Sequence, residues 1–469
     1  MTASAIPGSF RDPSARVFEC DGEILRGVDR ATFDNFLTLR EQPFYRALEN
    51  EGAIVRTEPA TGPNTEDVKA EGWHGVLRHE RIASTTYPYE WTFSMLKDAT
   101  LLQLDILEQC LKAGWVLKDF TPYNIQFAGS RAVFIDIPSF VPREAGAGWL
   151  AYRQFCMLNL YPLMLKAQLG IDFNSHLRAN LDGIAPAEFA RYFSGLRRFK
   201  RGVVSHVLFP AMMERAVEKR ERDGTPTRGL ARPYHSDAMM IGLVQSIRRL
   251  VTSLKSPIGH TKWSHYEHTH SYDASEHEAK KTFVTNAIAS GQHWRVIWDI
   301  GCNTGDFTRI CAKNSNIVIA TDADHDTVET LFLRERGRSG TNITPLVMNV
   351  SNPSPDQGWA GKERRAFDAR NRPDLVMCLA LLHHVSLGAN VPIPMFLDWL
   401  RSLGASVIVE FVDRHDEMVE KLLAQKQETY PEYTREIFDT ELRKRFLVHD
   451  EMPLKGNKRH IYFCGPLSQ

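Results

Sequence analysis

The stretch Val296–Phe307 reads VIWDIGCNTGDF and decides how the C-terminal part of the chain folds. A β-prone apolar run ends near Asp299, and Gly301 and Gly305 then frame a short turn ahead of a helical pattern. A glycine-framed turn that follows a buried strand is typical of cofactor sites in doubly wound α/β folds. The stretch therefore predicts a strand, a turn and a bound cofactor.

Strand-like and helical segments alternate around this turn. Strand-like runs are expected at 296–300, 317–321, 344–350, 373–379, 406–411, 446–449 and 459–464. Such alternation predicts a doubly wound, mainly parallel sheet of seven strands. The connection DEMPLKGNK (450–458) is too short for a helical crossover, so the last two runs are expected to pair as a hairpin with one strand antiparallel to the rest.

Three cofactor classes compete for the glycine turn. A phosphate-binding loop needs a lysine after its second glycine, whereas Asp306 stands there and would repel phosphate. A dinucleotide site needs Gly-x-Gly-x-x-Gly, and only Gly301-x3-Gly305 is present. S-adenosylmethionine has no phosphate and carries a sulfonium cation, which an acidic neighbour favours. The turn therefore favours S-adenosylmethionine, and Asp322, about 20 residues further on, is expected to bind the ribose hydroxyls.

This region resembles the class I S-adenosylmethionine-dependent methyltransferases, which have a Rossmann-like sheet. The resemblance rests on the glycine turn, Asp322, PLVMNV (345–350) and PDLVMCLALLHHV (373–385), in the order that the family has them. Asn349 departs from the aspartate that the family prefers at that place. The resemblance implies that the cofactor is bound by Asp299, Gly301, Cys302, Asn303, Gly305, Asp322, Asn349, Val350 and Leu379.

Other stretches extend the resemblance over nearly the whole chain. KWSHYEHTHSYDASEHEAKKTFV (262–284), ERRAFDAR (363–370), VIVEFVDRHDEMVEKLL (407–423) and RHIYF (459–463) resemble long bacterial two-domain methyltransferases. That group includes the rhizobial host-specific nodulation methyltransferases. The resemblance implies the reaction class, but it names no acceptor.

Candidate catalytic residues stand where strand-like runs end, because that edge of a doubly wound sheet faces the ligands. His383 and His384 follow one such run, and Glu410 ends an apolar run where a bare carboxylate is costly unless it contacts something. Each is a candidate for positioning the acceptor or for taking its proton. For the two histidines, a structural hydrogen bond is the alternative. For Glu410, the alternative is a buried ion pair with one of the arginines 364, 365 and 370.

The stretch 260–277 concentrates five histidines with aromatic residues. Trp263, Tyr266 and Tyr272 precede the first helix of the expected fold, where look-alike enzymes carry a cover for the cofactor. A zinc site is the alternative. No metal is expected, because no cysteine joins the histidines and their spacing fits no helix face. The seven cysteines of the chain also show no metal-type spacing.

The polar, Pro- and Gly-containing stretch LKSPIGHTK (254–262) predicts a domain boundary near residue 255. Residues 1–254 are expected to form an α+β, mostly helical domain, and residues 255–469 the methyltransferase domain. Within the first 60 residues the pattern predicts short strands at 16–19 and 54–57 and a helical stretch at 31–50.

One N-terminal segment, VLKDFTPYNIQFAGSRAVFIDIPSF (116–140), resembles the catalytic and metal-binding segment of kinases. There Asp119 would take a hydroxyl proton, and Asn124 and Asp136 would hold magnesium. Leu117 replaces the usual histidine, and neither a glycine-rich loop nor a strand-borne lysine precedes the segment. A degenerate, kinase-like scaffold is therefore expected, with an active kinase as the alternative.

The amino-acid composition limits the classes of partner that the protein is expected to bind. Lys+Arg and Asp+Glu are both 57, so the net charge is zero, which argues against a dedicated nucleic-acid binder. The basic region 195–255 is expected to be a solvated helical face, with a polyanion site as the alternative. The start of the chain lacks the features of a signal peptide, and the apolar stretch 155–169 is too short to span a bilayer. A cytoplasmic protein with no membrane association is expected.

The expected function is transfer of a methyl group to an oxygen or nitrogen of a small molecule or glycan intermediate. A protein or RNA acceptor that docks on the N-terminal half is one alternative, and a bifunctional, kinase-like ATP-binding protein is the other. The sequence does not predict the oligomeric state.

Overall fold

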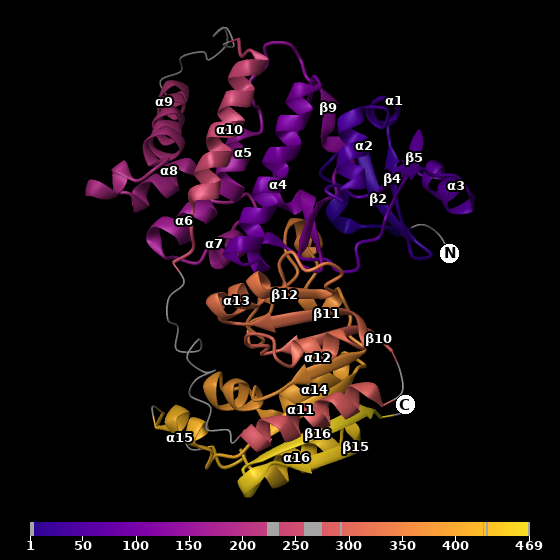
Figure 1. Cartoon of the computed structure of the whole chain (residues 1–469), viewed down its shortest axis with the longest axis vertical. Coiled ribbons are helices and arrows are strands. Elements are labelled where there is room, and N and C mark those ends of the chain that lie inside the picture. The colour runs from indigo at the N-terminus through magenta and orange to yellow at the C-terminus, as the bar shows by residue number, and fades with distance from the viewer. Residues whose placement is uncertain are drawn as a thin grey trace.

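The computed structural model describes residues 4–222, 234–257, 274–290, 293–424, 426–427 and 430–467. The described residues up to 257, here called the N-terminal half, and those from 274 to 467, the C-terminal half, form two bodies stacked along the long axis of the molecule (Figure 1).

A seven-stranded sheet forms the centre of the C-terminal half, in the order β12-β11-β10-β13-β14-β16-β15. Its strands are β10 (Trp294–Ile300), β11 (Ser315–Asp322), β12 (Ile343–Val347), β13 (Leu375–Cys378), β14 (Ser406–Val412), β15 (Phe446–Pro453) and β16 (Arg459–Pro466). Strands β10 to β14 run parallel, and β16 pairs antiparallel with both β14 and β15. The mainly parallel sheet with one reversed strand is therefore confirmed.

Helices cover both faces of this sheet. They are α11 (Ala274–Ala289), α12 (Thr308–Ala312), α13 (His325–Glu335), α14 (Ile393–Ser402), α15 (Glu417–Leu423) and α16 (Arg435–Arg443). Ile297 of β10 packs in one hydrophobic cluster with Val284 of α11, and the next residue, Trp298, packs in another. Successive side chains of a strand point to opposite faces, so both faces are buried and the strand reads as a continuous apolar run.

The N-terminal half begins with a five-stranded antiparallel sheet in the order β1-β2-β3-β5-β4. Its strands are β1 (Ser4–Ala5), β2 (Ala15–Cys20), β3 (Glu23–Val28), β4 (Thr57–Pro59) and β5 (Gly75–His79). The helices α1 (Arg30–Leu39) and α2 (Pro43–Asn50) lie between β3 and β4, and α3 (Pro63–Ala70) lies between β4 and β5.

The predicted strands and helix in the first 60 residues need correction. Four strands, β1 to β4, lie there where two were expected, and the strand predicted at 54–57 overlaps β4 only at Thr57. β3 was missed because charged residues and a glycine interrupt its apolar pattern. The single helix at 31–50 is two helices. Pro43 starts the second one, because its missing N–H is tolerated only in the first turn of a helix.

A long helix and two small strand pairs follow the sheet. Helix α4 (Phe93–Lys112) is buried along one face and begins at a Thr92 cap. Four short strands then pair in two hairpin-like units, β6 with β9 and β7 with β8. Their bounds are β6 (Trp115–Leu117), β7 (Ile125–Ala128), β8 (Arg131–Phe134) and β9 (Phe140–Pro142).

The rest of the N-terminal half is helical, as predicted. α5 (Tyr152–Phe155), the π-helical turn η5 (Cys156–Leu160) and α6 (Tyr161–Leu169) follow one another without a break. Gly170, in the left-handed conformation, ends this run. The remaining helical elements are α7 (Asn174–Ala179), α8 (Pro186–Phe189), η7 (Gly195–Phe199), η8 (Val204–Leu208), α9 (Phe209–Arg222) and α10 (Asp237–Ser253).

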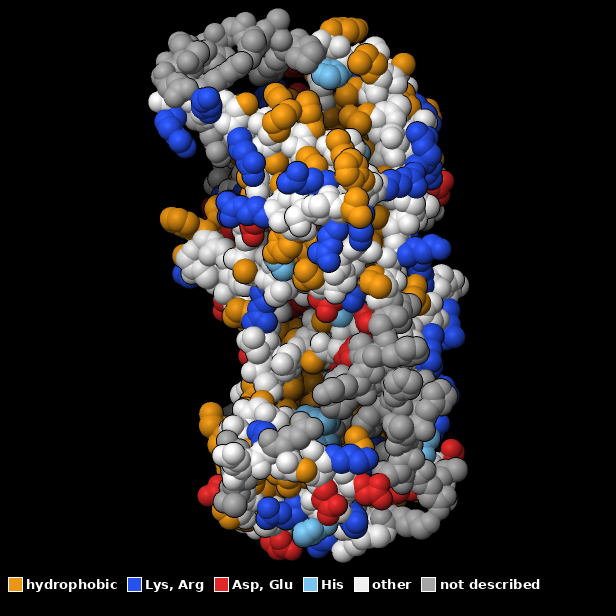
Figure 2. All heavy atoms as spheres, turned by 90° about the vertical axis from the view of Figure 1, so that its left-hand side faces the viewer, with side chains coloured by type: hydrophobic (Ala, Val, Ile, Leu, Met, Phe, Trp, Pro, Cys, Tyr) orange, Lys and Arg blue, Asp and Glu red, His pale blue; other side chains and the backbone are white. Residues whose placement is uncertain are grey.

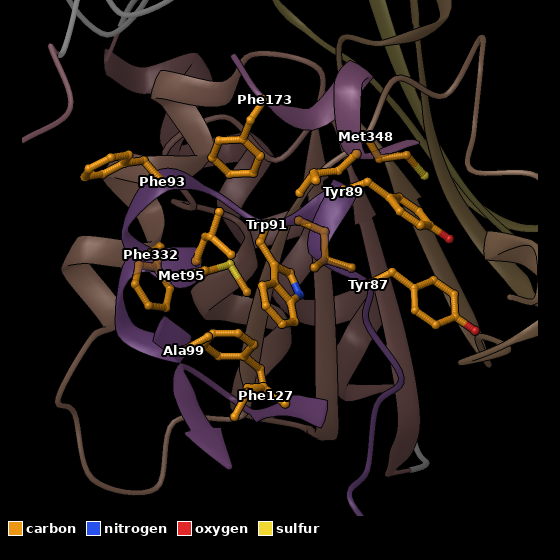
Figure 3. Close-up of a cluster of buried hydrophobic side chains, with 14 of the residues drawn as sticks. Tyr87, Tyr89, Trp91, Phe93, Met95, Ala99, Phe127, Phe173, Phe332 and Met348 are labelled. Atoms are coloured by element: carbon orange, nitrogen blue, oxygen red, sulfur yellow. The ribbon is translucent and has the colours of Figure 1, made fainter. Parts of the chain in front are cut away.

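An aromatic cluster joins the two halves (Figure 3). Trp91 packs edge-to-face on Phe127, with the ring centroids 5.1 Å apart, and Phe127 packs in the same way on Phe332 of α13 at 6.1 Å. Polar contacts accompany the rings, since Ser94 donates hydrogen bonds from its backbone N–H and its hydroxyl to Glu329. Met348, which follows β12, belongs to the same cluster. The N-terminal half therefore supports the edge of the sheet where β12 ends.

The basic region around α9 also carries apolar side chains on its surface (Figure 2). Arg197, Arg198 and Lys200 are exposed as predicted, but the neighbouring Leu196 and Phe199 are 87% and 79% exposed. This surface is therefore a mixed basic and apolar face rather than a uniformly charged one.

Candidate active site

A cavity of about 700 Å³ opens where β10, β11 and β13 end. Its volume lies within the range of small-molecule sites in proteins. Most of the residues predicted to bind a cofactor line it, namely Asp299, Gly301, Cys302, Asn303, Asp322, Asn349, Val350 and Leu379. Gly305 is a described residue of the set that does not line it. Tyr272 lies outside the described residues, as do Trp263 and Tyr266.

The glycine turn shapes one wall of the cavity. Gly301 has φ +79°, and its N–H and that of Cys302 both donate to the Thr321 carbonyl at 2.8 and 3.0 Å. Gly305 has φ +92°, and a Cβ added there would lie 2.4 Å from the Leu331 side chain. Gly305 therefore allows the close packing of the turn against α13 and does not itself line the cavity.

Two polar groups of the turn are placed to receive a ligand. The Asp322 carboxylate accepts hydrogen bonds from the backbone N–H groups of Asn303 at 3.2 Å and Asp324 at 3.0 Å, which hold it at the cavity wall. The Asn303 side-chain oxygen is buried and has no hydrogen-bond partner within the described part of the chain. A buried, unsatisfied acceptor beside an anchored carboxylate fits a ligand that presents hydroxyl or amino donors, as S-adenosylmethionine does.

Asp299 lies at the end of β10 and is 3% exposed. Burial raises the pKa of its carboxyl to about 7, although a hydrogen bond from the Thr308 hydroxyl at 2.5 Å opposes the shift. The nearby charge of Asp322 on β11 also raises the pKa of Asp299, whereas the charge of Lys280 on α11 lowers it. A cationic ligand in the cavity would favour the ionised form of Asp299.

His384 and His383 have different surroundings. His384 lines the cavity, and burial lowers the pKa of its imidazole, so the ring is neutral at neutral pH. His383 is 1% exposed and is not among the residues that line the cavity. The geometry therefore supports contact with an acceptor for His384 and does not support it for His383.

Glu410 lies beneath the cavity wall, which corrects the predicted direct contact with an acceptor. It is fully buried, accepts a 2.5 Å hydrogen bond from Lys280 Nζ and accepts a 2.8 Å bond from the backbone N–H of Ala380. Arg459 Nη1 is 3.6 Å away. Ala380 has φ +48°, a costly conformation for a residue with a side chain. Glu410 therefore holds the strained backbone after β13 against α11.

The arginines predicted as partners of Glu410 bond elsewhere. Arg370 forms an ion pair with Glu90 of the N-terminal half, and Arg364 stacks over the ring of Tyr123 at 4.4 Å. The backbone N–H of Arg365 donates to the Tyr87 hydroxyl at 3.1 Å. The ion-pair alternative for Glu410 was correct in kind, but Lys280 and Arg459 are the partners, because α11 and β16 pack against β14 in the fold.

Several residues that line the cavity were missed, and Lys280 and Asp172 are two of the charged ones. Lys280 is buried and burial lowers the pKa of its ammonium group. Asp172 follows α6 and comes from the N-terminal half. Lys166 bridges Asp172 at 2.6 Å and Asp326 of α13 at 2.9 Å. A lysine within a helical pattern and an aspartate in a loop give no local signal, so only their position in space marks them.

Among the described residues, no group of three or more His, Cys, Asp or Glu side chains could hold a metal ion. The histidines at 260, 265, 268 and 270 lie outside those residues, so the predicted absence of zinc there stays a prediction. In the part of the chain that the structure describes, no helix combines the length and apolar character needed to cross a membrane.

Comparison with known proteins shows the family to which the chain belongs. The chain is 34% identical over 464 residues to the nodulation protein NoeA of Rhizobium meliloti (strain 1021), and the match covers 97% of this chain and 95% of NoeA. The chain belongs to the NoeA family. No protein-family model matches it. The predicted resemblance to nodulation proteins is therefore confirmed over nearly the full length.

Several solved structures similar to this NoeA-family chain are methyltransferases. The N-methyltransferase NodS from Bradyrhizobium japonicum WM9, in complex with S-adenosyl-L-homocysteine, is 13% identical, and the match covers 44% of this chain and 98% of NodS with a TM-score of 0.32. The magnesium protoporphyrin IX methyltransferase from Synechocystis PCC 6803 is 15% identical over 40% of this chain and 83% of its own, with a TM-score of 0.28. The strand order and the cavity of the C-terminal half agree with the Rossmann-like fold expected of a class I methyltransferase.

The titration of Asp299 predicts how cofactor affinity depends on pH. Without cofactor, the carboxyl is protonated below about pH 7. A bound cation lowers this pKa, so binding releases a proton, and affinity is expected to rise by up to about tenfold per pH unit toward pH 7 and then to level off.

Calorimetry from pH 5.5 to 8, in two buffers of different ionisation enthalpy, measures both the affinity and the released proton. Asp299→Asn should flatten the profile and abolish the proton release. An affinity that falls between pH 5.5 and 7, or an equal profile in the variant, would contradict the assignment.

Proposed function

We propose that the protein transfers a methyl group from S-adenosylmethionine to an oxygen or nitrogen atom of a small molecule or glycan intermediate. The cavity is the observation that supports this proposal. One side holds the cofactor-type residues Asp299 and Asp322, and His384 and Lys280 line it as well. A site of this kind can align an acceptor with the methyl group and limit access of water.

His384 is the residue proposed to take the proton from the acceptor. Its imidazole is neutral at neutral pH because burial lowers its pKa, so it can accept a proton from a hydroxyl or an ammonium group. Lys280 and Glu410 are proposed as positioning residues. Their ion pair fixes α11 against the end of β13 and thereby shapes the wall on which the acceptor would lie.

Replacing His384 with glutamine is expected to lower methyl transfer about a hundredfold, the lower end of the range for general-base catalysis. Affinity for S-adenosylmethionine should change little, because the cofactor-type residues remain. Single-turnover assays with the cognate acceptor and calorimetry on the same preparation separate the two effects. His415→Gln is the matched control, because His415 is exposed and does not line the cavity. Unchanged turnover in His384→Gln would show that His384 is not the general base.

The chain is proposed to divide near residue 255 into an accessory domain (1–254) and a methyltransferase domain (255–469). All cofactor-type residues come from the second part, and Asp172 is a residue that the first part adds to the cavity. The N-terminal half would then complete the acceptor side of the site. All seven cysteines are buried, which agrees with a protein of the reducing cytoplasm.

A protein or RNA acceptor is the runner-up, supported by the basic side chains exposed around α9. Incubating the full-length protein with methyl-labelled S-adenosylmethionine and fractionated cell extract tests both proposals. Label in the low-mass or glycan fraction is expected. Label in protein or RNA, lost steeply as salt rises, would favour the runner-up instead.

A further inference from the structure

Three polar residues of the N-terminal half lie together and have no part in the proposed methyl transfer. Asn124, which precedes β7, donates from its amide to the Asp136 carboxylate at 3.2 Å, and Asp136 follows β8. Asp119 lies in the loop between β6 and β7. Burial raises the pKa of its carboxyl, and the nearby charge of Asp136 raises it further. All three side chains remain partly open to solvent, so a ligand can reach them.

A cation from a distant part of the chain completes this group. Arg26 of β3 places Nη1 2.6 Å from Asp136 Oδ1, across 110 residues of sequence. Its side chain is nine-tenths buried, and its Nε has no hydrogen-bond partner within the described part of the chain. In kinases the cation that contacts the phosphates stands on the third strand of the N-terminal sheet. Here an arginine, Arg26, is on the third strand of a five-stranded sheet, where kinases carry a lysine.

The loop that carries Asp119 is held rigidly by buried polar side chains. The backbone N–H of Phe120 donates to Gln154 at 2.7 Å, and the Phe120 carbonyl accepts from Asn159 at 3.0 Å. The Thr121 carbonyl accepts from Gln103 of α4 at 3.0 Å. Three helical elements therefore fix two consecutive loop residues. Groups that must meet a ligand in one geometry need this kind of support.

The surroundings of the group combine two cations with three carboxylates. Lys118 stands next to Asp119 and is 2.9 Å from Asp12, which belongs to the connection between β1 and β2. Lys118 and Ile137, the neighbour of Asp136, also line a cavity of about 250 Å³. Arg26 and Lys118 each pair with one carboxylate, and the carboxylates of Asp12, Asp119 and Asp136 outnumber the two cations. A phosphate would therefore enter together with a cation such as magnesium, which prefers oxygen ligands of this kind.

We propose that Asp136, Asn124 and Arg26 form a site for the phosphate groups of a magnesium-bound nucleoside triphosphate. Asp136 and Asn124 would bind the cation, and Arg26 would pair with a phosphate in place of Asp136. Asp119 would take the proton of a hydroxyl group that approaches the bound phosphate. The site does not rest on the proposed methyl transfer, since it shares no residue with the cofactor cavity.

Binding of ATP to the full-length protein tests the proposal. Calorimetric titration with ATP is carried out with Mg²⁺ and again with excess EDTA. Saturable binding that requires Mg²⁺ is expected, and Asn124→Ala and Asp136→Asn should each weaken it about 10–100-fold. Asp105→Asn is the matched control, because Asp105 is an ion-paired carboxylate of the same half, bonded to Arg248 and remote from the site. S-adenosylmethionine affinity should stay constant in all three variants.

Two outcomes would overturn the site. One is a wild-type protein that binds S-adenosylmethionine but shows no Mg²⁺-dependent binding of ATP. The other is ATP binding that Asn124→Ala leaves unchanged, which would place the nucleotide elsewhere. Asp136→Asn strands the buried Arg26 and can lower the folded fraction. Asn124→Ala removes only a neutral amide, so it decides the question if Asp136→Asn fails to fold.

Discussion

Replacing Asp322 with alanine is expected to weaken S-adenosylmethionine binding about 10²–10⁴-fold. A carboxylate that accepts hydrogen bonds from two ribose hydroxyls makes two charge-assisted bonds, each worth about 1.5–3 kcal/mol. The backbone N–H groups of Asn303 and Asp324 already hold the Asp322 carboxylate in place, so little ordering is needed on binding. Calorimetry with the full-length protein measures the loss.

The stability of the same variant separates binding from folding. Burial raises the pKa of Asp322, so without a ligand the ionised group is unfavourable there. Asp322→Ala is therefore expected to keep or raise the melting temperature of the protein without cofactor. Asp105→Ala, which removes a carboxylate from the other half, should leave the affinity unchanged. Equal affinities for Asp322→Ala and the wild type would reject the ribose-binding assignment.

Replacing Glu410 with glutamine is expected to lower the free energy of unfolding by about 3–5 kcal/mol. The change keeps the shape of the side chain, but it leaves the Lys280 ammonium buried without its 2.5 Å partner. Arg459 loses the nearby negative charge of Glu410 as well, but it keeps its ion pair with Asp416 at 2.7 Å. Denaturant unfolding gives the free energy, and single-turnover methyl transfer measured well below the melting temperature gives the catalytic effect.

Two further variants make the Glu410 result decisive. Glu278→Gln changes an exposed residue of the same helix, α11, and should leave stability unchanged. Adding Lys280→Met to Glu410→Gln removes the buried ammonium charge and is expected to restore part of the lost stability. Replacing a buried ion pair with uncharged groups is often neutral or stabilising. Normal stability with lost turnover in Glu410→Gln would instead restore the direct catalytic role predicted from sequence.

The features of the site that lie close together in sequence were predictable. The left-handed turn at Gly301 needs a residue without a side chain, and Asp322 ends the next strand at a set distance, so both could be read from spacing. The reversed strand β16 followed from a connection too short for a crossover. Local geometry determines each of these features, because each depends on the conformation of a few neighbouring residues.

The contacts that pair distant residues were decided only by the tertiary structure. Glu410 meets Lys280 across 130 residues and Arg26 meets Asp136 across 110, and nothing in either local pattern marks the partner. Asp172 reaches the cavity only because an aromatic cluster fixes the two halves together. Hydrophobic periodicity predicts which face of an element is buried, but it does not say what covers that face. The sequence alone determined the cofactor turn and the sheet, and packing decided which charges meet around them.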